Sequence, residues 1–262
     1  MFEGFDRLEE LLQLADYDNC AVYNWRPRNL ATDALRDPVK LPALTAYLKE
    51  VERTQHIRDE LVNLGPEHDA FDFEDPWAKL DYTERLLLYF LYVFMPGYML
   101  VFNGQLFGRQ HAYKKEIEKT LPAPRVADAD GAEREIGKRL FRLRRDYPQL
   151  VSGDYRLLEN DQQDVICLAC FDASEIVIGV INANSVAKKV VLSLSDIISG
   201  RPSLSDAEHA HYTQDVLLLK NPADGWISET RDNTAAEKLL QEGLPVRVAP
   251  QSCQVIRLRL NA

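Results

Sequence analysis

Apolar residues in the first 120 positions recur either at helical spacing or in short continuous runs. Helical spacing covers residues 6–14, 42–62 and 82–94, and short apolar runs cover residues 19–25, 61–64 and 98–102. Helices that alternate with buried strands are typical of parallel α/β units. This pattern predicts an α/β domain in the first part of the chain.

The longest apolar segment, residues 86–102, is divided by Pro96 and Gly97. It is shorter than the ~20 residues that a membrane-spanning helix needs, and a proline ends or kinks a helix. The division therefore predicts a buried helix followed by a buried strand that closes at Asn103-Gly104, and no membrane span.

The pattern changes in the second half of the chain. An acidic, proline-containing connector (residues 121–131) and a helix (133–146) come first. From Tyr155 onward there are short runs rich in Val, Ile and Leu, at residues 165–171, 176–182, 189–194, 216–219 and 255–260. Such runs, separated by turn residues, are typical of an antiparallel β-sandwich. We predict two domains, α/β over residues 1–150 and all-β over residues 151–262.

Charge narrows the range of partners. The chain has 31 Lys plus Arg against 41 Asp plus Glu, a formal net charge of -10. This field repels phosphate backbones, so we expect neither nucleic acid nor an anionic membrane as a partner. The cluster Arg139, Arg142, Arg144 and Arg145 is read as the solvated face of a helix. The N-terminus is acidic and amphipathic, unlike a secretory signal, so we expect a cytoplasmic protein.

The four cysteines do not form a disulfide framework in a chain of this length. Cys167 and Cys170 make a C-x-x-C, but they lie in an apolar run that reads as a strand, where positions three apart face opposite sides. We therefore predict buried structural thiols.

Three segments carry a family resemblance. Residues 96–108 read PGYMLVFNGQLFG, residues 137–155 read GKRLFRLRRDYPQLVSGDY, and residues 248–258 read VAPQSCQVIRL. In this order they resemble the end of the barrel, the last barrel helix and the closing strand of the C-terminal domain in the alpha-amylase superfamily of glycoside hydrolases and transglycosylases. The family's Gly-Gln-Glu turn is Gly104-Gln105-Leu106 here. The resemblance implies the C-terminal part of a (β/α)8 TIM-type barrel followed by a β-sandwich.

The same resemblance implies site residues. Pro66-Glu67-His68-Asp69 stands where the family carries Asn-His-Asp after its seventh strand, with Glu67 in place of the asparagine. Asp69 would be the transition-state carboxylate and His68 its hydroxyl-binding neighbour. Such a pair can hydrogen-bond to two ring hydroxyls more tightly as the sugar distorts toward an oxocarbenium ion. The alternative is that both residues simply belong to an acidic loop.

The rest of the site is incomplete. By resemblance, Glu3 takes the acid/base position of the fifth strand, and Tyr23, Trp25 and Trp77 are candidate substrate-binding residues. The family's nucleophile motif, an Arg-x-Asp at the end of the fourth strand preceded by an Asp-x-x-x-Asn-His segment at the third, is not found. A full barrel needs ~250 residues, so the resemblance covers only its later part. A half barrel exposes two sheet edges, which favours the missing half or a second copy of the chain as a partner.

Three hypotheses follow. The chain acts in hydrolysis or glucosyl transfer on alpha-glucosides or alpha-glucans together with the missing half, or it is an inactive relative that binds sugar or a subunit. In the third hypothesis, a cluster of carboxylates supplies oxygen ligands suited to Ca²⁺ or Mg²⁺, at Asp69, Asp72, Glu74 and Asp75. Apart from such an ion, we expect no cofactor.

Overall fold

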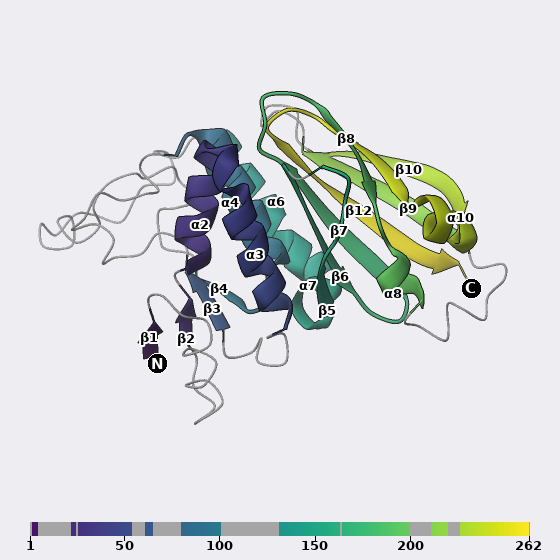
Figure 1. Cartoon of the computed structure of the whole chain (residues 1–262), viewed down its shortest axis with the longest axis horizontal. Helices are drawn as coiled ribbons and strands as arrows, with labels where there is room; N and C mark the ends of the chain where they lie inside the picture. Colours follow the sequence, from purple (N-terminus) through teal and green to yellow (C-terminus); the bar gives the residue numbers. More distant parts are fainter. Residues whose placement is uncertain are drawn as a thin grey trace, which may run out of the picture. The chain divides into compact units, whose positions relative to one another are not determined.

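The computed structural model describes residues 2–4, 22–24, 26–53, 61–64, 80–100, 131–162, 164–199, 211–219 and 226–261. The chain divides into two compact units, residues 1–143 and 144–262. The division lies within helix α6 (Gly131–Asp146). Figure 1 labels the elements of both units.

The first unit contains a four-stranded parallel sheet. Its strands are β1 (Phe2–Gly4), β2 (Val22–Asn24), β3 (Leu61–Leu64) and β4 (Tyr98–Leu100). They lie side by side in chain order, and each neighbouring pair is parallel. Parallel neighbours need a crossover connection, and helices supply it after β2 and after β3. The predicted α/β organisation is confirmed in this form.

Helices α2 (Arg26–Arg36), α3 (Leu41–Glu52) and α4 (Tyr82–Phe94) pack together, with α2 in contact with both of the others (Figure 1). A short 3₁₀ turn, η1 (Pro38–Lys40), joins α2 to α3. Every residue of α4 from Leu86 to Phe94 is buried, which explains its continuous apolar sequence. No helix in the described part of the chain combines the length and apolarity needed to cross a bilayer.

One prediction about these helices is wrong, and one helix was missed. The helix expected over residues 42–62 ends at Glu52. The strand expected at residues 61–64, which overlapped that helix, is confirmed as β3. Short apolar runs satisfy both periodicities, so the helical pattern ran on into the strand. Helix α2 was not predicted, although Pro27 in its first turn and buried Ala31, Ala34 and Leu35 at helical spacing give a recognisable signal.

The second unit is built on a six-stranded antiparallel sheet in the order β10-β9-β12-β7-β6-β5. A separate pair, β8 with β11, forms a two-stranded antiparallel sheet. The strands are β5 (Asp154–Leu157), β6 (Val165–Phe171), β7 (Glu175–Asn182), β8 (Lys188–Leu192), β9 (His211–Leu219), β10 (Trp226–Ala235), β11 (Leu244–Val248) and β12 (Ser252–Asn261). In the described part of this unit, three short helices accompany them, α7 (Gln149–Ser152), α8 (Ser195–Ser199) and α10 (Ala236–Glu242).

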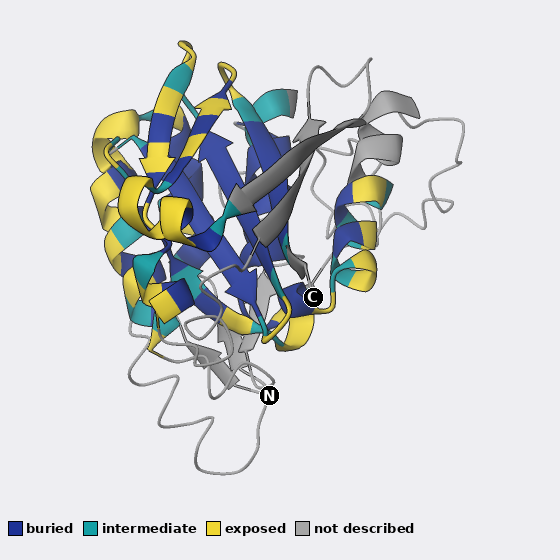
Figure 2. Cartoon of the chain, turned by 90° about the vertical axis from the view of Figure 1, so that its right-hand side faces the viewer, coloured by how far each residue is buried: buried dark blue, intermediate teal, exposed yellow. Residues whose placement is uncertain are grey.

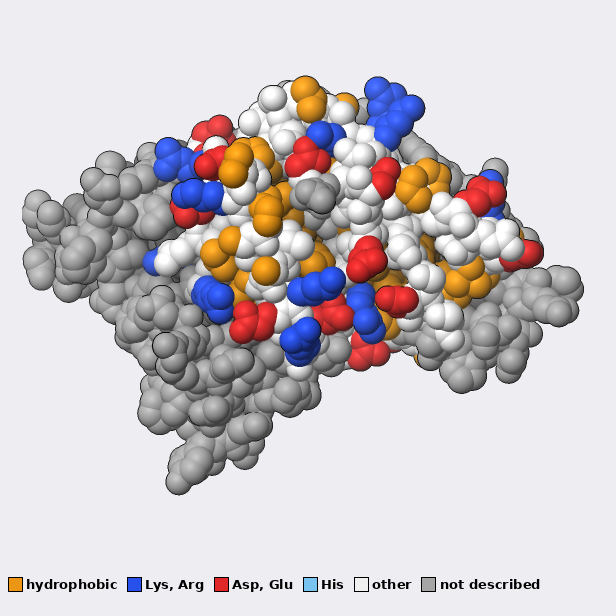
Figure 3. Space-filling view, viewed as in Figure 1, with side chains coloured by type: hydrophobic (Ala, Val, Ile, Leu, Met, Phe, Trp, Pro, Cys, Tyr) orange, Lys and Arg blue, Asp and Glu red, His pale blue; other side chains and the backbone are white. Residues whose placement is uncertain are grey.

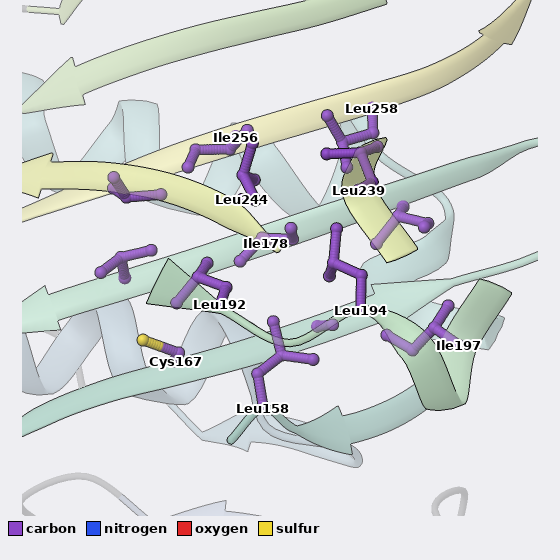
Figure 4. Packing of buried hydrophobic residues seen from close by; sticks show 14 of the residues in the cluster. Leu158, Cys167, Ile178, Leu192, Leu194, Ile197, Leu239, Leu244, Ile256 and Leu258 are labelled. Carbon is purple, nitrogen blue, oxygen red and sulfur yellow. The ribbon is translucent and has the colours of Figure 1, made fainter. Parts of the chain in front are cut away.

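The core of this unit lies between one face of the large sheet and the elements opposite. Figure 4 shows Ile178 and Ile256 from the large sheet, Leu192 and Leu244 from the small sheet, and Leu239 from α10. Fully burying such a side chain contributes about 1.5–3 kcal/mol. The small sheet alternates buried and exposed residues, whereas β6 is buried throughout (Figure 2).

The predicted apolar runs correspond to real strands. The run 165–171 is β6, 176–182 lies in β7, and 255–260 lies in β12. The run 189–194 extends beyond β8, which ends at Leu192, while β9 begins five residues before the predicted 216–219. Strands β5, β10 and β11 were not predicted. The chain therefore contains a partial α/β part and an antiparallel part.

Candidate functional site

The carboxyl edge of the parallel sheet is the candidate site. The last residues of the four strands are Gly4, Asn24, Leu64 and Leu100. Carboxyl ends of parallel strands meet at one edge, where the following loops line ligand sites in α/β folds. All six predicted site residues lie within the strands or in the segments that follow them.

Two of these residues are brought together by the strand register. Glu3 in β1 is the register partner of Tyr23 in β2, and each is the second-to-last residue of its strand. Adjacent parallel strands lie about 4.8 Å apart. The same row continues to Val62 in β3 and Tyr98 in β4. The backbone thus places Glu3 next to Tyr23, two of the predicted site residues, near the carboxyl edge of the sheet.

The other four predicted site residues lie outside the described residues. His68 and Asp69 come soon after Leu64, the last residue of β3, and Trp25 directly follows the last residue of β2. Trp77 lies three residues before the described segment resumes at Leu80.

A capped helix fixes the downstream end of the segment that holds His68 and Asp69. The Asp81 carboxylate accepts a hydrogen bond from the Glu84 backbone N–H at 2.8 Å, and the Glu84 carboxylate accepts one from the Asp81 N–H at 2.8 Å. This capping box satisfies two backbone donors at the start of α4. Buried Arg85 also donates to the Leu80 carbonyl at 2.7 Å. The start of α4 is therefore stabilised by local hydrogen bonds.

The far end of α4 sets the start of β4. Its last backbone hydrogen bond runs from the Met95 N–H to the Leu91 carbonyl, and Pro96 and Gly97 follow. Gly97 has φ of 103°, a conformation that favours glycine. The Pro-Gly pair thus ends the helix and turns the chain into the strand, as the sequence predicted.

Arginines at the start of α2 are a feature that the sequence reading missed. Arg26 pairs with Glu50 at 3.4 Å, and its guanidinium carbon lies 5.3 Å from the centre of the Tyr47 ring. Arg28 is buried. Burial raises the pKa of the Tyr92 hydroxyl far above its usual value, and the Arg28 charge opposes this only in part. Tyr92 therefore stays protonated and is a structural group rather than an acid or base.

The described residues give no support to a metal centre. Among them, no group of three or more His, Cys, Asp or Glu side chains is placed to hold an ion. The proposed cation ligands Asp69, Asp72, Glu74 and Asp75 lie outside the described residues. On the face shown in Figure 3, acidic and basic side chains of the described residues are interspersed.

The described cysteines are buried, as predicted for Cys167 and Cys170. Cys167, Cys170 and Cys253 are fully or almost fully buried and form no disulfide, whereas Cys20 lies outside the described residues. Cys167 belongs to the core of the second unit, whereas Cys170, three residues along the same strand, does not. Burial raises the pKa of the Cys167 and Cys253 thiols well above the usual value, so neither forms a reactive thiolate.

Comparison with known proteins identifies the fold. No protein-family model and no curated protein matches the chain. An alpha-amylase from Geobacillus thermoleovorans, solved with acarbose, matches 99% of the chain with a TM-score of 0.66 and 15% identity. The chain shares its fold with part of the alpha-amylase-type enzymes. The cyclic alpha-maltosyl-(1→6)-maltose hydrolase of Arthrobacter globiformis matches 99% with a TM-score of 0.63 and 14% identity. The acarbose-soaked debranching enzyme of Nostoc punctiforme matches 97% with a TM-score of 0.59 and 13% identity.

The match to the alpha-amylase-type fold covers different shares of the two proteins compared. Nearly all of this chain is covered, but only 53% of the Geobacillus protein, 48% of the Arthrobacter protein and 49% of the Nostoc protein. The chain therefore spans about half the length of the solved structures it matches. The predicted family resemblance is confirmed at the level of fold.

Proposed function

We propose that the chain acts on alpha-glucans or alpha-glucosides, by glycoside hydrolysis or glucosyl transfer, together with a complementary half of the barrel. The observation that carries the proposal is the near-complete match to alpha-amylase-type structures of about twice its length. Two of these structures were obtained with acarbose. The parallel sheet in chain order also supports the proposal, because a (β/α)8 barrel is built in that order.

In this proposal, residues 1–150 are the C-terminal part of the barrel and residues 151–262 are a β-sandwich domain. Two sheets that enclose one core favour the sandwich. The cytoplasmic location predicted from the sequence remains a prediction.

The chemistry is divided between the two halves. Asp69 would hold the substrate hydroxyls as the ring distorts, with His68 beside it, and Glu3 would protonate the leaving oxygen. Tyr23, Trp25 and Trp77 would contact the sugar. A retaining mechanism needs two carboxyl groups about 5–5.5 Å apart, so the complementary half must supply the nucleophile opposite Glu3.

The second candidate function is an inactive relative that binds sugar or a subunit. The missing nucleophile motif favours it, because without that carboxylate the chain can bind a glucoside but cannot form a glycosyl-enzyme intermediate. Both candidates predict an alpha-glucan site, and only the first predicts turnover.

Calorimetric titration of the chain with acarbose tests the site that both candidates share. We expect saturable binding, which His68→Ala should weaken about 10-fold or more. The reason is that one hydrogen bond to a substrate hydroxyl contributes about 0.5–1.5 kcal/mol, and a charge-assisted one contributes more. His211→Ala, at the start of β9 in the second unit, is the matched control and should bind as the unmodified chain does. Absence of heat at millimolar acarbose, or equal affinities for the two variants, would remove the assigned site.

A further inference from the structure

Glu3 and Tyr23 are the first two members of a row of register partners that crosses the parallel sheet. The row runs from Glu3 in β1 through Tyr23 in β2 and Val62 in β3 to Tyr98 in β4. Successive residues of a strand alternate between the two faces of a sheet, and register partners of adjacent strands share a face. The pairing therefore places a glutamate and a tyrosine at neighbouring positions on one face.

The face that carries this row is open at β4. Tyr98 is 58% exposed, whereas the preceding helix α4 is buried from Leu86 to Phe94. A residue that gives a proton to a substrate must lie on a face that the substrate can reach. The position of Glu3 in this row is compatible with the acid/base role proposed for it.

The chemistry of the neighbouring residue bears on that role. Adjacent parallel strands are about 4.8 Å apart, within the combined reach of long and aromatic side chains. A tyrosine hydroxyl can donate a hydrogen bond, and an ionised carboxyl group can only accept one. Such a donor favours the charged form of the carboxyl group and lowers its pKa. In β2, the described strand that pairs with β1, only Tyr23 is titratable.

We propose that Tyr23 is a positioning residue for Glu3, whose carboxylate accepts a hydrogen bond from the Tyr23 hydroxyl. The inference rests on the proposed function, in which Glu3 is the acid/base, and it gives Tyr23 a second role beside the sugar contact. Glu3 gives its proton to the leaving oxygen and then takes one from the attacking water. Desolvation in a closed barrel raises the pKa of a carboxyl group, and the Tyr23 hydroxyl limits that rise.

Carbon-13 NMR of the chain labelled at its glutamate carboxyl carbons tests the proposal without any substrate. Glu3→Gln removes one signal and thereby assigns the Glu3 resonance. Titration then gives the pKa of Glu3 in the unmodified chain and in Tyr23→Phe, which keeps the ring and removes the hydroxyl. We expect Tyr23→Phe to raise this pKa, with a fall of at least about threefold in the acid dissociation constant of Glu3.

Tyr98→Phe is the matched control. It removes a hydroxyl from the same row at β4, three strands away from Glu3, and should leave the pKa of Glu3 unchanged. Thermal melts of both variants check that each folds.

In the native assembly, Tyr23→Phe separates positioning from sugar binding. Loss of positioning moves the alkaline limb of the kcat/KM profile to higher pH, because that limb reports the pKa of the essential acid. Loss of a sugar contact alone raises KM and leaves the limb in place.

Two results would overturn the proposal. One is a pKa of Glu3 that is the same in Tyr23→Phe and in the unmodified chain. The other is an equal change in Tyr23→Phe and Tyr98→Phe, which would show an effect that does not depend on the neighbouring position. A pKa of Glu3 that responds only to Tyr23→Phe, in an assembly that turns over no alpha-glucan, would contradict the proposed function and support the pairing of Tyr23 with Glu3.

Discussion

At the scale of single residues, the clearest polar arrangement in the second unit surrounds Asp172, between β6 and β7. Its carboxylate accepts hydrogen bonds from the Ser174 N–H at 2.7 Å, the Ser174 hydroxyl at 2.8 Å and the Glu175 N–H at 3.0 Å. It also accepts one from the Gln149 amide at 2.7 Å, which connects α7 to the turn. Partial burial alone would raise the pKa of Asp172, but these hydrogen bonds outweigh it and hold that pKa below its usual value.

The stability of the second unit should therefore depend on Asp172 and on pH. A carboxyl whose pKa is lower when folded stabilises above its unfolded pKa, ~3.9, and loses that contribution as pH falls through the folded value. We expect Asp172→Ala to cost about 1–3 kcal/mol at pH 7, since it removes a charged acceptor from several donors. Urea unfolding at pH 7 and pH 3 measures this. A variant whose deficit is as large at pH 3 as at pH 7 would contradict the assigned role of the charge.

The candidate site could be predicted from the sequence only in part. The spacing His68-Asp69 and the position of Glu3 suggested a site through a family resemblance. The neighbouring positions of Glu3 and Tyr23 could not be derived that way. They depend on the pairing of two three-residue strands, and strands so short carry too little pattern to fix a register.

At the scale of elements, local signals were clearest where burial is uniform. Strand β6 and helix α4 are buried almost throughout, so their apolar runs predicted them directly. Strand β10, with the sequence WISETRDNTA, is largely polar and has an irregular register, and β11 carries Pro245, which argues against a strand. Tertiary pairing, not local pattern, forms these two strands.

Helix α4 offers a direct test of an element. Asp81→Ala removes the carboxylate that accepts the Glu84 N–H in the capping box. It should destabilise the first unit by about 0.5–2 kcal/mol. Asp81→Asn retains an acceptor for the Glu84 N–H, so its loss of stability should be only a few tenths of the loss caused by Asp81→Ala. Chemical denaturation of both variants measures the difference. Equal losses would show that the charge, rather than the cap hydrogen bond, stabilises the helix.

At the scale of the whole molecule, two compact units reproduce about half of an alpha-amylase-type structure. The sequence predicted this extent from the missing nucleophile motif and from the number of α/β elements, because both depend only on what the chain contains. Through the family resemblance it also indicated exposed sheet edges, but it could not indicate which strands form them, since backbone edges carry no side-chain signal. The edges of β1 and β4 emerge only from the strand order.

Turnover by the chain in its native assembly is the measurement closest to the central claim. The tagged chain and its Asp69→Asn variant would be purified under native conditions from the natural source and incubated with maltoheptaose. We expect release or transfer of short maltooligosaccharides, reduced at least ~100-fold by Asp69→Asn, about 2.7 kcal/mol of transition-state stabilisation. Equal turnover by both would contradict the role of Asp69. No turnover of any alpha-glucan by an assembly that contains the complementary half would contradict the enzymatic function itself.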